Sequence, residues 1–115
     1  MTLDTAPDSQ TSAALSEMQG NAGKAARFLK SLAHEGRLMI LCHLGDGEKS
    51  VGQLEALLDM RQAAVSQMLA RLRDVGLVAT RRDGKTIYYS LADENTRRTI
   101  ALLYEMFCAG DDGTC

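Results

Sequence analysis

Apolar residues recur along most of the chain with the period of amphipathic helices. The first dozen residues are the exception, because they are polar and show no period, and we predict a flexible tail over 1–12. A short helix is expected over 11–19, and a further helical face over 25–32, where apolar residues fall at i, i+3, i+4 and i+7. Residues 34–44 are apolar on nearly every side, which predicts a buried helix that ends at the Gly-Asp-Gly of 45–47.

The central part of the chain predicts two short helices joined by a tight turn. Ser50 and Gln53 have the spacing of a capping box, which would begin a helix that runs to Leu58. A second helix is expected from Gln62 to Val75, with an inner face made of the apolar side chains Val65, Met68, Leu69 and Leu72. This arrangement is typical of a helix-turn-helix unit.

A β-hairpin and a last helix are expected after this unit. Asp83-Gly84 is a strong signal for a two-residue turn in which both residues have positive φ. Apolar and polar residues alternate along 86–91, so one face of this strand should pack and the other should face water. The last helix is predicted over 93–109. The fold class is therefore mainly α with a small β-hairpin wing: one winged helix-turn-helix domain over 13–109, followed by a flexible tail over 110–115.

The distribution of charge changes the picture that the overall composition suggests. The chain has 115 residues and a net charge of −2, which by itself argues against a nucleic-acid ligand. Residues 61–90, however, hold six Lys and Arg against two Asp, so this segment carries +4 and the remainder −6. An acidic protein with one basic strip is suited to meeting phosphate groups on a single face.

The helix-turn-helix and the hairpin present the side chains that double-stranded DNA would require. Gln can bridge the adenine edge and Arg the guanine edge in the major groove, which a helix can enter. For this role we predict Arg61, Gln62, Ala63, Ser66 and Gln67. For phosphate or minor-groove contacts we predict Arg71, Arg73, Arg81, Arg82 and Lys85. The alternative is a small α/β domain whose hairpin only covers its core.

Other classes of protein find less support in the sequence. A dithiol oxidoreductase would show a CxxC motif beside a βαβ pattern, and the sequence has neither. A hydrolase would need a nucleophile motif together with its histidines, and none accompanies the two histidines of this chain. We therefore expect neither an enzyme nor a cofactor. The N-terminus lacks the pattern of a signal peptide, and no apolar stretch approaches the roughly 20 residues of a membrane span. We expect a cytoplasmic protein without membrane contact. Three cysteines cannot all pair within one chain and a reducing cytoplasm keeps ordinary thiols free, so we do not expect a structural disulfide framework.

Two segments resemble the ArsR (ArsR/SmtB) family of bacterial repressors. They are FLKSLAHEGRLMIL at 28–41 and MRQAAVSQMLARLRDVGLVATRRDGKTIYYSL at 60–91, and the likeness continues into the helix that follows. The resemblance implies a homodimer that pairs through its terminal helices and reads a palindromic operator. Its half-sites would lie about 34 Å apart, one turn of DNA.

The family usually releases DNA on binding an effector, and the residues favour a thiol chemistry over a metal. Metal-sensing relatives carry Cys-x-Cys or Asp, His and Glu ligands, whereas VGQLEALLDM at 51–60 has no cysteine and DENTRRTIALLYEMF at 93–107 has no histidine. We therefore expect no metal site. A metal-sensing repressor stays the less favoured alternative, with Cys42, His43, Cys108 and Cys115 as its available ligands. Cys42 and Cys108 instead resemble the paired cysteines of the persulfide-responsive SqrR and BigR type of repressor. That resemblance implies that extra sulfur atoms join the two thiols and that the protein then leaves its operator.

The distance between two thiols could make them respond to persulfides and not to agents that form a plain disulfide. The same two cysteines also allow other interpretations. A plain disulfide needs Cα atoms within roughly 7 Å, so two thiols held farther apart would close only through inserted sulfurs, each adding about 2 Å. Free cysteine is also among the most buried residue types, so Cys42 and Cys108 can equally be core residues. A peroxide-responsive repressor with an ordinary disulfide, and a DNA-binding protein without effector, fit the same residues. Cys115 lies in the terminal GDDGTC, where we expect a spectator.

Overall fold

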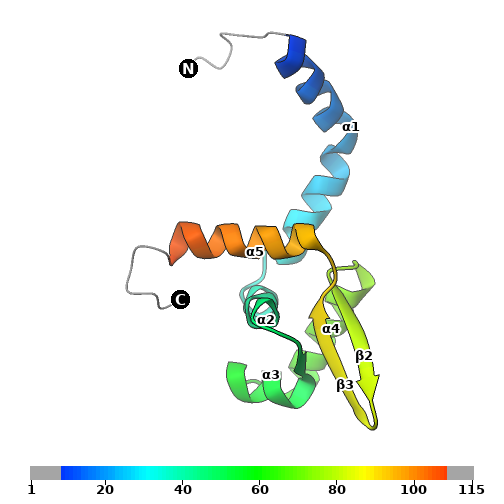
Figure 1. The fold of residues 1–115 in the computed structure, drawn as a ribbon, viewed down its shortest axis with the longest axis vertical. Coiled ribbons are helices and arrows are strands. Elements are labelled where there is room, and N and C mark those ends of the chain that lie inside the picture. Colours follow the sequence, from blue (N-terminus) through cyan, green and yellow to red (C-terminus); the bar gives the residue numbers. More distant parts are fainter. Residues whose placement is uncertain (1–8, 109–115) are drawn as a thin grey trace. The chain divides into compact units, whose positions relative to one another are not determined.

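A computed structural model of the chain describes residues 9–108, with side chains described from residue 13 on. These residues divide into two units, one ending at Lys30 and the other beginning at Ser31, and each is described by itself. The first unit consists of helix α1, Ser9–Leu32, up to Lys30. The helices and strands that follow α1 belong to the second unit (Figure 1).

Helix α1 is one continuous helix of 24 residues. The predicted tail over 1–12 is therefore wrong for residues 9–12, and the short helix over 11–19 is part of a longer one. Gly20 and Gly23 lie inside α1, and interior glycine costs a helix only about 0.5–1 kcal/mol because it removes no hydrogen bond. The apolar side chains Leu15 and Met18 are exposed. In the described part of the chain, neither α1 nor any other helix is long and apolar enough to cross a membrane.

The second unit combines four helices with a three-stranded antiparallel sheet of order β1-β3-β2. The helices are α2 Glu35–Gly45, α3 Val51–Leu58, α4 Gln62–Asp74 and α5 Glu94–Phe107. The strands are β1 Lys49–Ser50, β2 Val78–Asp83 and β3 Thr86–Leu91. Figure 1 shows α5 lying across α2, with the β2–β3 hairpin extending away from α5.

The helix ends follow from local hydrogen bonds. His34 caps α2, because its Nδ1 accepts from the backbone N–H groups of Gly36 at 3.1 Å and Arg37 at 3.3 Å. The predicted capping box of α3 is confirmed: Ser50 Oγ accepts from Gln53 N, and Gln53 Oε1 accepts from Ser50 N. The turn before α4 begins at Asp59, whose left-handed conformation (φ 55°) ends α3.

The core of the second unit lies between the helices and the base of the hairpin. Its fully buried apolar side chains are Ile40, Leu41, Leu44, Leu54, Val65, Leu69 and Leu72. The predicted inner face of α4 is thus confirmed, apart from Met68, which is only half-buried. Met68 packs so closely on α2 that a Cβ added to Gly36 would lie 2.8 Å from its Sδ atom. A side chain at position 36 would therefore require Met68 to move.

The hairpin forms where it was predicted but differs in two details. Asp83 pairs with Thr86, so the turn residues are Gly84 and Lys85, and only Gly84 has positive φ (68°). A single positive φ at the first central position is what a type II′ turn needs, in place of the expected pair. Burial along β3 rises from exposed Ile87 to buried Leu91 without alternating, because the tip projects beyond the core.

Candidate functional site

The exposed face of α4 carries the residues predicted to read bases. Arg61, Gln62, Ala63, Ser66 and Gln67 are all exposed. At 100° per residue Ala63 and Gln67 lie on the side of α4 opposite to its buried residues, and Ser66 lies beside them. Arg61 and Gln62 are exposed because they stand at the start of the helix. Arg61 is the N-cap residue of α4 and makes no capping hydrogen bond through its side chain.

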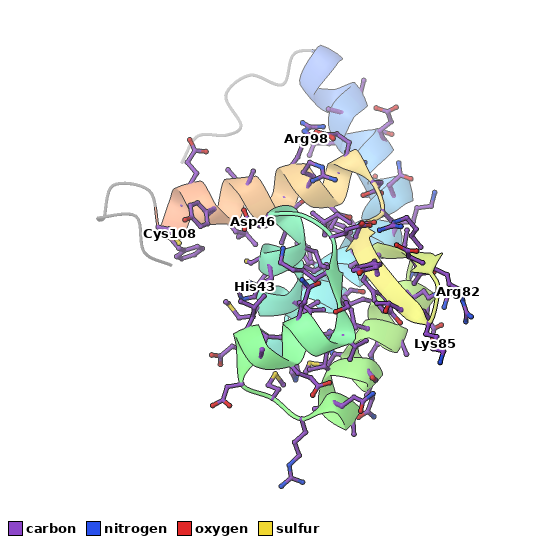
Figure 2. The ribbon with its side chains drawn as sticks, turned by 60° about the horizontal axis from the view of Figure 1, so that its bottom comes forward. His43, Asp46, Arg82, Lys85, Arg98 and Cys108 are labelled. Atoms are coloured by element: carbon purple, nitrogen blue, oxygen red, sulfur yellow. The ribbon has the colours of Figure 1, made fainter. Side chains whose placement is uncertain are left out.

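Basic side chains continue from α4 to the hairpin. Arg71 and Arg73 are exposed in the last turn of α4, where positive charge also suits the helix dipole. Arg82 and Lys85 are exposed near the tip of the hairpin (Figure 2). The fold thus keeps the basic strip of the sequence on one helix and one hairpin that follow each other directly.

Arg81 is engaged within the protein. Its guanidinium donates two hydrogen bonds to the carboxylate of Glu48, one of them from Nε to Oε2 at 3.2 Å, and it lies 4.8 Å from the centre of the Tyr88 ring. The hydrogen bond from Arg81 lowers the pKa of the Glu48 carboxyl. Glu48 lies 33 residues from Arg81 in sequence, so no local pattern reveals this pair. Arg81 thus supports the hairpin, while the DNA contacts predicted for Arg81, Arg82 and Lys85 stay predictions.

A pocket of about 500 Å³ lies between α2 and α5. It is lined by Met39, Cys42, His43, Gly45, Asp46, Arg97, Ile100, Ala101 and Tyr104. The α5 residues recur at i, i+3, i+4 and i+7, so they form one stripe of that helix. The other wall comes from Met39, Cys42 and His43 of α2 and from Gly45 and Asp46 at its C-terminal end.

Cys108 continues the α5 stripe. It follows Tyr104 by four residues, one helical turn or about 6 Å along the axis, and its N–H donates to the Tyr104 carbonyl at 2.8 Å. Cys108 is buried, with 3% of its surface exposed, at the end of α5 (Figure 2). Cys42 therefore lines the pocket between α2 and α5, and Cys108 lies one helical turn beyond the last α5 residue that lines it.

Cys42 and Cys108 differ in covalent state, because one is a free thiol and the other is in a disulfide. Cys42 is a half-buried free thiol, and burial raises its pKa, so the protonated form is favoured at neutral pH. Cys108 is disulfide-bonded in this structure, and since Cys42 is free, the two sulfurs are not bonded to one another. The sequence did not lead us to expect a disulfide at Cys108. Cys115 lies outside the described residues.

The histidines offer no metal centre among the described residues. A group of three or more His, Cys, Asp and Glu side chains able to hold an ion does not occur in 9–108. His34 is moreover committed as a cap: an Nδ1 atom that accepts hydrogen bonds leaves the proton of neutral imidazole on Nε2, so neither nitrogen is available to a metal. His43 lines the α2–α5 pocket beside Cys42.

The sequence did not identify two charged residues of the pocket. Asp46 stands out in the sequence only as part of the Gly-Asp-Gly that ends a helix, and no motif marks Arg97. They are 51 positions apart, as their residue numbers show, and only the packing of α5 on α2 brings both to one pocket.

Comparison with known proteins agrees with this architecture. Residues 34–80 match the family model described as a bacterial regulatory protein of the arsR family. A biofilm growth-associated repressor of Agrobacterium fabrum is 49% identical over 98 residues, covering 85% of this chain and 84% of that protein.

Solved structures extend the likeness to the fold. Reduced HlyU from Vibrio cholerae superposes with a TM-score of 0.76 at 46% identity, covering 80% of this chain and 97% of that one. A homodimeric winged helix-turn-helix DNA-binding domain from Mycobacterium bovis superposes with a TM-score of 0.71 at 31% identity, covering 85% of this chain and 91% of that one. The predicted winged helix-turn-helix fold is confirmed.

Proposed function

Because the chain belongs to the ArsR family of DNA-binding bacterial regulatory proteins, which are not enzymes, we propose that it is an operator-binding homodimer regulated by Cys42 and Cys108. Its effector is a persulfide or polysulfide. The reactive sulfur species joins the two thiols through inserted sulfur, and the cross-linked protein leaves its operator, which is repressed while the protein is bound. The observation that supports this regulation is the placement of Cys42 in the pocket between α2 and α5, with Cys108 one helical turn beyond Tyr104 of the same pocket.

DNA recognition falls to α4 and the hairpin. The exposed α4 face, centred on Ser66 and Gln67, enters the major groove and contacts base edges. Arg82 and Lys85 at the hairpin contact the backbone or minor groove beside it. In a dimer, the two copies of α4 read half-sites about 34 Å apart.

The outer face of α5 is suited to pairing with a second copy of the chain. Leu102 and Met106 are 53% and 60% exposed, and at 100° per residue they lie roughly opposite to the pocket stripe of the same helix. Apolar side chains exposed in adjacent turns mark an interaction surface. The homodimeric relative from Mycobacterium bovis supports the same assignment. One helix would thus face the sensing thiols on one side and the partner subunit on the other.

Cys42 is the thiol that we expect to react first. It is a free thiol in contact with the pocket, whereas Cys108 is buried, and its disulfide has to be reduced before it can take part. Each thiol takes the outer sulfur of a persulfide, RSSH, and releases RSH. One protein persulfide then attacks the inner sulfur of the other and expels hydrogen sulfide, which leaves a trisulfide. The sum is two Cys-SH and two RSSH giving Cys-SSS-Cys, two RSH and one hydrogen sulfide, without an added oxidant.

Such a bridge would act on DNA binding through α5. It fixes the distance between α2, which packs on α4, and α5, which carries the proposed dimer face. A change in the relative position of the subunits moves the two copies of α4 out of register with the half-sites. A coupling of about 1–3 kcal/mol would weaken operator binding roughly 5- to 150-fold.

The test is an intact-mass measurement with peptide mapping, performed on reduced protein carrying Cys115→Ser so that the third thiol cannot interfere. A persulfide donor is expected to give a product in which one or more added sulfurs link Cys42 to Cys108, and to release a labelled operator chosen by binding selection. Cys42→Ser and Cys108→Ser should each retain operator binding and lose the response. Retention of the response in both variants would contradict the proposal.

Peroxide serves as the parallel treatment that separates persulfide sensing from general redox sensing. If the thiols are too far apart for a plain disulfide, peroxide gives no Cys42–Cys108 link. A direct disulfide formed as readily as the sulfur-bridged product would identify a general redox repressor. The absence of any link under both treatments would leave Cys42 as a core residue.

A further inference from the structure

The pocket at Cys42 has features that small inorganic sulfide would not require. Its volume of about 500 Å³ falls within the range of about 300–1,000 Å³ that is typical of sites for small organic molecules. Two residues of opposite charge, Asp46 and Arg97, line it together with the free thiol of Cys42. The pocket thus combines a nucleophile, an anion and a cation around one space.

Asp46 is fixed at one wall of the pocket by the end of α2. It is the C-cap residue of this helix, and its backbone N–H donates to the carbonyl oxygens of His43, at 3.1 Å, and Leu44. Its side chain is exposed, and the described residues place no cation within ion-pair distance of it. The carboxylate therefore remains able to bind an ammonium group.

Arg97 supplies positive charge from the first turn of α5. Its Nε lies 3.8 Å from the Glu94 carboxylate one turn earlier, and both side chains are at least half exposed, so this ion pair is weak. The guanidinium retains donors for a ligand carboxylate, which it can bind in a bidentate manner. The neighbouring Arg98 points elsewhere: Figure 2 shows Arg98 and Asp46 on opposite sides of α5.

We propose that this pocket binds the sulfur donor as an α-amino-acid persulfide, with Arg97 holding its carboxylate and Asp46 its ammonium group while its outer sulfur meets Cys42. This inference rests on the proposed function and adds the chemical class of the donor. An α-amino acid carries an ammonium and a carboxylate on one carbon, which matches a pocket with one anion and one cation. Cysteine persulfide and peptide persulfides with a free α-amino-acid group belong to this class.

The transfer step needs no further reactant. The Cys42 sulfur attacks the outer sulfur of R–S–SH, a new S–S bond forms at Cys42, and the S–S bond of the donor breaks. The electron pair of the broken bond leaves on the inner sulfur, which takes the proton that Cys42 gives up. The products are Cys42–S–SH and R–SH. Burial holds Cys42 largely protonated, so a bound donor compensates for a small thiolate fraction by raising the local concentration of its sulfur.

The experiment compares two donors that differ chiefly in charge: cysteine persulfide, and the persulfide of N-acetylcysteine methyl ester, which lacks both charged groups. The rate of persulfide formation on Cys42 is followed by quenched mass spectrometry in the reduced Cys115→Ser protein. We expect the zwitterionic donor to react about tenfold faster, since two charge-assisted contacts hold it. Arg97→Gln and Asp46→Asn should each remove most of this preference and leave the rate with the ester within about twofold of its starting value.

Arg98→Gln is the matched control, because it removes the same charge from the adjacent position of α5, outside the pocket. It should leave both rates unchanged, and thermal unfolding of all variants should confirm that they fold. Equal rates for the two donors in the unsubstituted protein would overturn this inference. So would an equal loss of the preference for cysteine persulfide in Arg97→Gln and Arg98→Gln. Neither result would contradict the proposal that the protein senses persulfides. A protein in which neither donor modifies Cys42 would refute the proposed function itself.

Discussion

Replacing Arg82 by Ala should reduce the salt dependence of DNA binding by an amount that the structure allows us to calculate. Arg82 is exposed near the tip of the hairpin and is assigned a phosphate contact, so each subunit loses one neutralised phosphate. A dimer loses two, and at about 0.9 logarithmic units per phosphate the slope of log K against log salt should become about 1.8 less negative. Between about 50 and 200 mM salt, the unsubstituted protein should then lose about 12-fold more affinity than the variant.

Arg81 and Glu48 provide the matched controls. Arg81→Ala should change the slope far less, because the guanidinium of Arg81 is bonded to Glu48 and stacked on Tyr88. Glu48→Gln should make the slope steeper, since it releases the charge of Arg81 toward the DNA. Fluorescence anisotropy with a labelled random-sequence duplex, titrated over a series of salt concentrations, measures all three slopes. Equal slopes for Arg82→Ala and Arg81→Ala would refute the division of roles between these two neighbours.

Further predictions concern specificity, helix capping, acid stability and thiol reactivity. Gln67→Ala should weaken binding to the operator more than to the random duplex, because an exposed glutamine on α4 is assigned to base edges; equal losses on both duplexes would contradict this. Ser50→Ala removes the capping box of α3 and should lower the free energy of unfolding by about 1 kcal/mol in urea titrations. Hydrogen bonds from Thr96 lower the pKa of the Asp93 carboxyl, so the stability that its charge provides is present above the unfolded pKa and is lost as pH falls through the lower folded pKa. The stability difference between the unsubstituted protein and Asp93→Asn, from urea titrations at several pH values, should accordingly shrink on acidification, and a constant difference would show that the charge is irrelevant. Burial raises the pKa of Cys42, so its alkylation by iodoacetamide should accelerate about tenfold per pH unit from about pH 6 to 8, and a plateau near neutral pH would reveal an activated thiolate instead.

Local signals in the sequence determined the order and most of the boundaries of the helices and strands in the second unit. The capping box of α3 is complete within four residues, so the sequence predicts it directly. The spacing of apolar residues along α4 likewise predicts which face of this helix is buried. The glycine of the hairpin turn likewise marked its place, although the turn lies one residue later than expected. Helix caps, buried helix faces and tight turns depend on residues that are close in sequence, so they can be predicted from the sequence alone.

Signals within α1 were weaker, and the prediction there was less accurate. The polar residues before residue 13 carry no apolar period, yet the helix begins at Ser9. Once a helix has formed, each further residue adds a hydrogen bond at little cost, so α1 extends into a segment whose composition does not require it.

Tertiary structure decided which residues share a site. The ion pair of Arg81 with Glu48 and the meeting of Asp46 with Arg97 join positions far apart in sequence, and no periodicity encodes them. The sequence also determined that Cys42 and Cys108 lie on helices or at their ends, but only the packing of α5 across α2 made the pocket that Cys42 lines. The physical reason is general: hydrogen bonds and apolar period act over a few residues, whereas a pocket is the space left between elements after the whole core has packed.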